Sequence, residues 1–142
     1  MKVQDVVNRK GTDVVTIRSD DTVAQLVTLL HQNRIGAVVV SDDSGCVHGI
    51  ASERDVVRGL AEHGAAVLEQ PVSSLMSRDV HTCSPGEDIA VLAERMTTLR
   101  IRHLPVLTDE QLAAIISIGD VVKSRLDQLT DERNQLISYV QG

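Results

Sequence analysis

The sequence predicts an α+β fold made of two β-α-β-β-α repeats that pack with pseudo-two-fold symmetry. The chain has 142 residues, which suits one compact domain or two small repeats that share a core. It matches itself when it is shifted by about half its length, as expected for an internal repeat. Within each copy, apolar residues alternate between strand-like and helix-like spacing. A single tyrosine, with no Phe or Trp, leaves an aliphatic core.

The internal repeat extends over three successive offsets along the chain. Residues 14–43 match the chain from residue 80 onward, an offset of 66. One residue then drops out of a turn, and Asp55 falls on Asp120 at an offset of 65. Upstream, an offset of 69 aligns 3–9 with 72–78. The offsets change only where turns can absorb an insertion, which indicates a duplication.

Each copy is predicted to contain the same elements in the same order. A short amphipathic turn or helix precedes a β-prone stretch, a helix with apolar residues on one face, a two-stranded hairpin and a closing helix. In the first copy we expect them at 2–8, 14–17, 23–30, 37–40, 47–51 and 53–63. In the second copy we expect them at 72–77, 80–83, 89–96, 104–107, 112–116 and from 118 onward.

The turns and the connection between the copies carry residues with particular backbone preferences. Asp42 to Gly45 is predicted as a hairpin turn, in which an aspartate accepts from the backbone and glycine supplies a positive φ. The matching turn at 108–111 lacks glycine, so we expect a different geometry there. Gly64 is predicted to end a helix, and Pro71 to break regular structure before the second copy.

A long helical pattern closes the chain, from Asp120 to Val140, with Arg133 interrupting its apolar positions. A helix of about 20 residues spans about 30 Å, more than so small a domain needs. We therefore expect a homodimer contact here, with packing on its own domain as the alternative. The predicted boundaries are 1–64 for the first repeat, 65–71 for the linker, 72–125 for the second repeat and 126–142 for the C-terminal helical extension.

Charge and composition exclude several function classes. Lys and Arg number 14 against 20 Asp and Glu, a net charge of −6, without the basic footprint or the aromatic platforms of nucleic-acid-binding domains. No apolar run approaches the roughly 20 residues that span a membrane, and no signal-peptide core is present, so we expect a cytoplasmic location. Cys46 and Cys83 lack the paired spacing of metal ligands, and a redox role would need them close together in space.

A Ser-x-x-Asp pattern recurs where the hairpin of each repeat meets its closing helix, from Ser52 to Asp55 and from Ser117 to Asp120. One interpretation is a capping box, which stabilises a helix by about 1 kcal/mol. The other is a nucleotide site, because a helix N-terminus attracts phosphate and an Asp in its first turn can accept from both ribose hydroxyls. The recurrence at matching positions favours the nucleotide site.

The duplicated unit resembles the cystathionine-β-synthase (CBS) domain. The segments that carry the resemblance are GIASERDVVR at 49–58, RIRHLPVL at 100–107 and ISIGDVVK at 116–123, with the Val-x-Thr stretch that opens each repeat. Together they extend over nearly the full length of the chain. The resemblance implies a stand-alone pair of CBS repeats, a Bateman module, that senses a ligand and performs no chemistry. The implied ligands are AMP, ADP, ATP or NAD, while other CBS modules bind S-adenosylmethionine.

The resemblance also implies which residues hold the ligand. The Asp holds the ribose, the Ser assists at ribose or phosphate, and the partner repeat holds adenine through backbone and aliphatic groups. For the first cleft these positions are Asp55, Ser52, Ile50 and Arg54, with Thr82, Ile101, Arg102 and His103. For the second cleft they are Asp120, Ser117 and Ile115, with Val14, Thr16, Ile35, Gly36 and Ala37. Lys10, expected on a loop before the first strand, reaches a second phosphate or points to solvent.

Two departures from the family pattern bear on the Asp120 cleft. Ala114 stands where the family usually has glycine, and its methyl group would hinder backbone approach. Gly36 and Ala37 are smaller than is usual in the family and would leave the same cleft roomier. These effects oppose each other, so the sequence leaves open which cleft binds better.

Together these features predict a non-catalytic sensor of cellular energy or redox state. We expect it to bind an adenine nucleotide between the repeats and, as a homodimer, to change conformation for an unidentified regulated protein. No metal, nucleic acid or membrane partner is expected. The alternative is a ligand-free interaction scaffold in which both Ser-x-x-Asp pairs only cap helices. An enzyme ranks last, because no nucleophile–base pair or GxxxxGK loop is evident.

Overall fold

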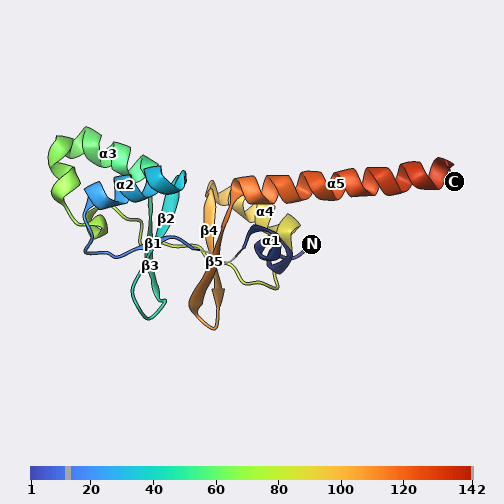
Figure 1. Ribbon diagram of the computed structural model, residues 1–142, viewed down its shortest axis with the longest axis horizontal. Coiled ribbons are helices and arrows are strands. Elements are labelled where there is room, and N and C mark those ends of the chain that lie inside the picture. The colour runs from blue at the N-terminus through green and yellow to red at the C-terminus, as the bar shows by residue number, and fades with distance from the viewer. Residues whose placement is uncertain (12–13, 142) are drawn as a thin grey trace.

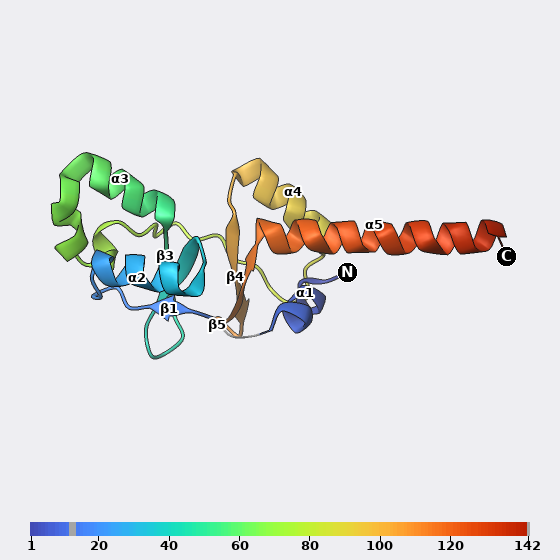
Figure 2. The ribbon, with the colours of Figure 1, turned by 45° about the horizontal axis from the view of Figure 1, so that its top comes forward.

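The computed structural model describes residues 1–11 and 14–141. Over these residues it contains five α-helices and two small β-sheets, which confirms the predicted α+β class and two repeats. The two sheets lie side by side in the middle of the molecule, and the helices lie mainly on the outer sides (Figure 1). One long helix extends away from the body and ends at the C-terminus, which is also clear after a 45° turn (Figure 2).

The first sheet has the strand order β1 (Thr16–Ile17), β2 (Ala37–Ser41) and β3 (Val47–Ser52). β1 runs parallel to β2, and β2 runs antiparallel to β3. The central strand β2 is buried along its whole length. Its side chains share one aliphatic core with the apolar faces of α2 (Val23–Asn33) and α3 (Glu53–His63). The helix predicted at 53–63 is confirmed, with the same first and last residues.

The second sheet consists of β4 (His103–Thr108) and β5 (Gln111–Ser117), which pair in antiparallel orientation. Helix α4 (Ile89–Leu99) buries its apolar face against them, and Asp88 caps it by accepting from Ala90 N at 2.8 Å. The helix and the two strands therefore follow one another in the same order as in the first repeat, because the apolar residues recur at matching positions.

The opening stretch of the second repeat, predicted as a strand at 80–83, does not form one. Only Cys83 makes a strand-like bridge, to Val106 on β4. The carbonyl group of Thr82 instead accepts a hydrogen bond from the Arg95 guanidinium. The two residues before it line a cavity described below. With its groups engaged in this way, the stretch lacks the consecutive backbone pairs of a strand.

The two hairpin turns have the geometries expected from their sequences. In the first turn, Ser44 N donates to Oδ1 of Asp42 at 2.9 Å, and Gly45 has a φ of 81°. In the second turn, Asp109 and Glu110 have φ values of 51° and 64°. Two successive positive φ values are typical of a type I′ turn, which usually selects glycine or asparagine. The second hairpin thus closes without glycine through a backbone conformation that side chains disfavour.

The segment that opens each repeat packs into the core of the other repeat. Helix α1 (Val3–Lys10) buries three valines in the core formed by α4, β4 and β5. Conversely, Val72 and Met76 lie in the core of the first repeat. Val3 N also donates to Glu87 O at 2.9 Å, which ties the start of the chain to the second repeat. The predicted repeat boundaries follow the order of the chain. Each core, in contrast, combines residues from both predicted repeats.

The predicted linker at 65–71 packs against the first repeat. Most of it forms a 3₁₀-helix, Gly64–Glu69, which buries Val67. Val67 lies so close to α3 that a Cβ at Gly59 would meet its Cγ2 at 3.0 Å. Gly64 ends α3 with a φ of 69°, which confirms the predicted helix stop.

Helix α5 (Ile118–Gln141) begins on the second core and then leaves the body of the protein (Figures 1 and 2). Val121 and Ser124 are its buried residues, and every described residue beyond Gln128 is exposed. Its 24 residues correspond to about 36 Å at 1.5 Å per residue. The predicted long helix is confirmed, while the homodimer contact stays a prediction; residue 142 lies outside the described residues.

Thiol labelling is expected to distinguish the two cysteines. Cys83 is buried in the second core, and burial raises the pKa of its thiol to about 12, whereas Cys46 is exposed. Because the thiolate is the reactive form, a thiol reagent should modify Cys46 alone in the native protein and both residues in denaturant. Mass spectrometry of the native protein and of Cys46→Ser tests this. Rapid modification of native Cys46→Ser would contradict the burial of Cys83.

Candidate functional site

A cavity of about 740 Å³ lies where the two repeats meet, a volume typical of small-molecule sites. The first repeat contributes the starts of β2 and α3, and the second contributes the stretches before Thr82 and before β4. The described residues that line it are Gly36, Ala37, Ile50, Ser52, Glu53, Arg54, Asp55, Val57, Arg58, Ser77, Asp79, Val80, His81, Arg100, Ile101, Arg102 and His103. A molecule bound here would contact both repeats.

Asp55 lies in the first turn of α3, at the wall of this cavity. Ser52 Oγ accepts from Asp55 N at 3.2 Å, and Oδ2 of Asp55 accepts from Ser52 N at 2.9 Å. The Ser-x-x-Asp pattern is therefore a capping box. The second oxygen, Oδ1, lies 3.6 Å from Arg58 Nη1, longer than a good hydrogen bond. Capping uses one carboxylate oxygen, so the capping and ligand-binding interpretations of Asp55 are compatible.

Charged side chains give the cavity a local charge opposite to that of the whole chain. The backbone N–H of Glu53 is already bound to Gly36 O at 2.9 Å, so the N-terminus of α3 offers fewer free donors than predicted. The cavity is lined by four arginines and three carboxylates: Arg54, Arg58, Arg100 and Arg102 with Glu53, Asp55 and Asp79. Four minus three leaves a net charge of +1 with neutral histidines, against −6 for the chain. Guanidinium groups are well suited to phosphate.

His103 is half-buried at the edge of the cavity. Its pKa lies below the usual histidine value, mainly because burial disfavours the charged imidazolium and also because Lys10 adds positive charge nearby. Asp120 acts in the opposite direction with a smaller effect. The neutral ring that results can either donate or accept a hydrogen bond to a ligand.

Most residues predicted for the first cleft line this cavity: Ile50, Ser52, Arg54, Asp55, Ile101, Arg102 and His103. Thr82 does not, because its stretch is held by Arg95. Gly36 and Ala37, expected beside Asp120, line the Asp55 cavity instead, since the bond from Glu53 N to Gly36 O holds them beside α3. Sequence reasoning missed Glu53, Val57, Arg58, Ser77, Asp79, Val80, His81 and Arg100 as lining residues.

Asp120 repeats the helix cap of Asp55 but has different surroundings. Ser117 Oγ accepts from Asp120 N at 3.1 Å, and Asp120 Oδ2 accepts from Ser117 N at 2.9 Å. The same Oδ2 lies 2.6 Å from Nζ of Lys10, which ends α1 and does not lie on a loop. Burial raises the pKa of Asp120, but the bonds from Lys10 and Ser117 lower it more, so the net shift is downward.

The other residues predicted around Asp120 do not line the Asp55 cavity. Val14 packs against the core of the second repeat, and Ile35 packs against the core of the first. Thr16 pairs with β2 as part of β1. Ile115 lies on β5, and its carbonyl group accepts from Lys10 Nζ at 2.9 Å. Of the predicted second-cleft residues, Ser117, Asp120 and Ile115 thus remain together, with Lys10 among them.

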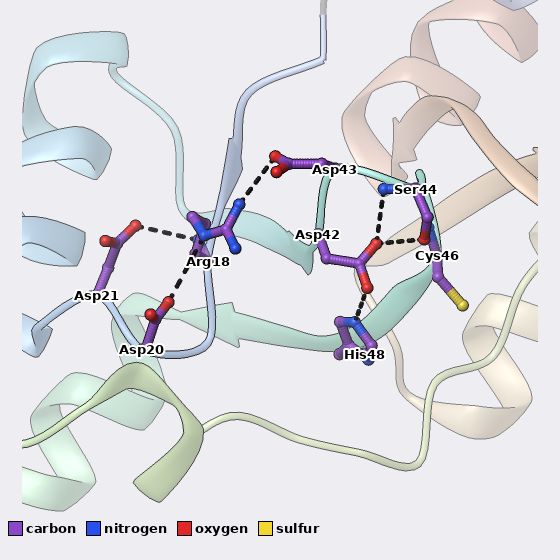
Figure 3. Close-up of polar contacts among 8 residues, drawn as sticks. All are labelled: Arg18, Asp20, Asp21, Asp42, Asp43, Ser44, Cys46 and His48. Atoms are coloured by element: carbon purple, nitrogen blue, oxygen red, sulfur yellow. Dashed lines mark hydrogen bonds and ion pairs between the residues drawn. The ribbon is translucent and has the colours of Figure 1, made fainter.

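A polar cluster lies apart from this cavity, at the tip of the β2–β3 hairpin (Figure 3). Asp42 accepts from the Ser44 hydroxyl, and its other oxygen lies 2.7 Å from His48 Nε2. The hydrogen bonds from Ser44 and then His48 hold the pKa of Asp42 well below its usual value. Ser44 and His48 thus share one carboxylate and form no nucleophile–base pair. The residues described by the structure contain no group of three His, Cys, Asp or Glu side chains suited to a metal.

Comparison with known families identifies the repeats. The CBS-domain model matches residues 3–62 and 72–127, most of the chain, so this protein belongs to the CBS-domain family. The match indicates no catalytic family. Among the described residues, no helix is both long enough and apolar enough to cross a membrane.

Several known proteins resemble the chain along most of its length. The mitochondrial CBS domain-containing protein CBSX3 of Arabidopsis thaliana is 30% identical, over 99% of this chain and 72% of its own. The crystal structure of the CBS-domain containing protein ATU1752 from Agrobacterium tumefaciens is 47% identical, with a TM-score of 0.84 over 88% of this chain and 99% of that one. A more distant fold match, at 24% identity and a TM-score of 0.74, is the CBS domain protein PAE2072 from Pyrobaculum aerophilum complexed with AMP; it covers 84% of this chain and 89% of that one.

Proposed function

We propose that this protein is a non-catalytic sensor that binds an adenine nucleotide in the Asp55 cavity. The observation that carries the proposal is the cavity itself, where a capped helix start, a carboxylate and four arginines converge between the repeats. Oδ1 of Asp55 would accept from ribose hydroxyls, and aliphatic groups such as Ile50, Val80 and Ile101 would pack on the adenine ring. The AMP complex of the distant neighbour PAE2072 supports an adenine ligand.

The charge of the cavity favours ligands that carry phosphate. Arg54, Arg58, Arg100 and Arg102 outnumber the carboxylates, and each good guanidinium–phosphate pair is a strong, charge-assisted contact. S-adenosylmethionine carries a sulfonium and an ammonium group, which these arginines would repel. AMP, ADP, ATP and NAD all supply the phosphate, so we expect this group to bind in preference to S-adenosylmethionine.

Binding would couple the two repeats because the cavity has walls from both. The lining residue Asp55 lies on α3 of the first repeat, and His103 lies on β4 of the second. A ligand that contacts both favours those relative orientations in which both contacts form, and a regulated protein in the same compartment detects the resulting shift in population. The two free thiols agree with a reducing compartment such as the cytoplasm.

A thermal-unfolding panel tests the proposed ligand class. AMP, ADP, ATP, NAD, S-adenosylmethionine and GTP are each added at rising concentration, and unfolding is followed by calorimetry because the chain has one tyrosine and no tryptophan. A ligand at about 100 times its Kd stabilises the native state by about 2.7 kcal/mol, which raises the Tm by about 10 °C. We expect this rise for one or more phosphate-bearing adenine ligands. No rise with any of them would favour the ligand-free scaffold.

Helix α5 supports the further proposal that the sensor is a homodimer. Beyond the body, its apolar side chains are exposed, with Leu126 at 59% and Leu136 at 65%. A helix with a polar surface all round would need no partner, but this one carries an apolar stripe that only Arg133 interrupts. A second copy of the same helix provides a matching stripe, so pairing of two α5 helices would bury both.

A further inference from the structure

The Asp55 cavity and the matching region around Asp120 carry opposite charges at one pair of matching positions. The offset of 69 that aligns 3–9 with 72–78 places Lys10 opposite Asp79. Asp79 is exposed and lines the open Asp55 cavity. Lys10 lies at the matching place beside Asp120, where it donates to Oδ2 at 2.6 Å. The duplicated site has therefore received opposite charges in its two copies.

Lys10 occupies the groups that a ribose would use in the second cleft. Its Nζ bonds to the Asp120 carboxylate and, at 2.9 Å, to the carbonyl oxygen of Ile115. The side chains of Lys10 and Asp120 are 35% and 25% exposed, so the pair is partly shielded from solvent and holds more strongly than a surface ion pair. A ligand could reach Asp120 only by displacing the ammonium group.

The backbone of α1 explains why Lys10 reaches this place. Beside the first sheet, the extended chain at Ser77 pairs with Ile50 on β3 through bonds of 3.0 and 2.8 Å. A Cβ at Gly49 would meet Ser77 O at 2.6 Å, so this approach requires glycine. Beside the second sheet, the matching segment is α1, which is helical through Lys10.

Position 49 of the first repeat corresponds to Ala114 of the second, at the offset of 65. Ala114 keeps a methyl group, buried in the second core. At β5 the amine of Lys10 is bound to the Ile115 carbonyl, where the first repeat has a backbone strand pair at Ile50. The difference between the two regions therefore involves the backbone as well as side chains.

We propose that Lys10 closes the Asp120 cleft and thereby restricts nucleotide binding to the Asp55 cleft, one ligand per chain. Lys10 then determines which cleft binds the nucleotide and does not itself contact a phosphate group. The inference rests on the proposed function for the nature of the ligand, but the contacts of Lys10 are independent of it. Removal of the side chain would expose Oδ2 of Asp120 beside the start of α5 and restore a second site.

Isothermal titration with ATP and with AMP tests the closure. We expect one ligand per chain for the native sequence and two for Lys10→Ala, with the added site lost again in Lys10→Ala combined with Asp120→Asn. The matched control is Arg9→Ala, which removes a cation from the same helix. Among residues 1–11 and 14–141, the ion pair of Arg9 is an exposed 3.7 Å contact with Asp127. This control is expected to keep one ligand per chain.

Four other outcomes have distinct meanings. Two ligands per native chain would overturn the closure. Weaker binding at a single site in Lys10→Ala would also overturn it and would make Lys10 a phosphate donor. A third outcome is that the native chain binds no ligand, while Lys10→Ala binds one that is lost with Asp120→Asn. This result would support the closure and refute the proposed Asp55 site. An absence of binding in every variant would refute both.

Discussion

Replacement of Asp55 by alanine is expected to raise the Kd for the adenine nucleotide by at least about 100-fold. Oδ1 of Asp55 is the carboxylate oxygen outside the capping box, and it faces two ribose hydroxyls in the proposed complex. Each charge-assisted hydrogen bond contributes about 1.5–3 kcal/mol, and 1.4 kcal/mol corresponds to a factor of ten in Kd. Isothermal titration measures the change directly.

The same substitution also removes the Asp55 half of the capping box of α3, so a control must separate stability from binding. Loss of a cap costs about 1 kcal/mol, which lowers the Tm by about 4 °C in a domain of this size. Asp88→Ala removes the cap of α4, where Asp88 accepts from Ala90 N at 2.8 Å, at a position outside the cavity. We expect a similar loss of Tm from both variants and a loss of affinity from Asp55→Ala alone. Equal affinity in the two variants would show that Asp55 is only a cap.

The order of elements could be predicted from the sequence because local patterns determine it. Apolar spacing marked α2 and α4, and the Ser-x-x-Asp pattern marked the starts of α3 and α5. Gly45 and Gly64 have the positive φ values that their positions in the chain predicted. Each of these features depends on neighbours within a few residues, which a single sequence contains in full.

Features that depend on tertiary contacts could not be predicted in this way. The packing of α1 into the second core depends on which sheet lies nearest, and the strand expected at 80–83 was lost to a hydrogen bond from Arg95 to Thr82. The alignment of 3–9 with 72–78 did contain one unused signal, because it pairs Lys10 with Asp79. Such a charge reversal between matching positions indicates that two related clefts have diverged.

Replacement of Leu129 by aspartate is expected to convert the protein from a dimer to a monomer. On α5, Val122, Leu126, Leu129, Leu136 and Val140 follow the four–three spacing of a coiled-coil seam, interrupted by Arg133. Leu129 lies near the middle of this stripe and is 50% exposed in the single chain. A projecting helix of this length is only marginally stable alone in water, so pairing with a second α5 both buries the stripe and stabilises the helix.

Analytical ultracentrifugation should give a mass near twice the 15.4 kDa chain for the native sequence and a single chain for Leu129→Asp. Ser138→Asp adds the same charge on the opposite side of the helix and should leave the dimer intact. Arg133→Leu should lower the dimer's dissociation constant, because it replaces a charged seam position with an apolar one. A native protein that sediments as a monomer, or Leu129→Asp and Ser138→Asp variants that behave alike, would leave the stripe without a role in self-association. Dissociation by Leu129→Asp alone, together with tightening by Arg133→Leu, would locate the dimer contact on α5, away from the Asp55 cavity.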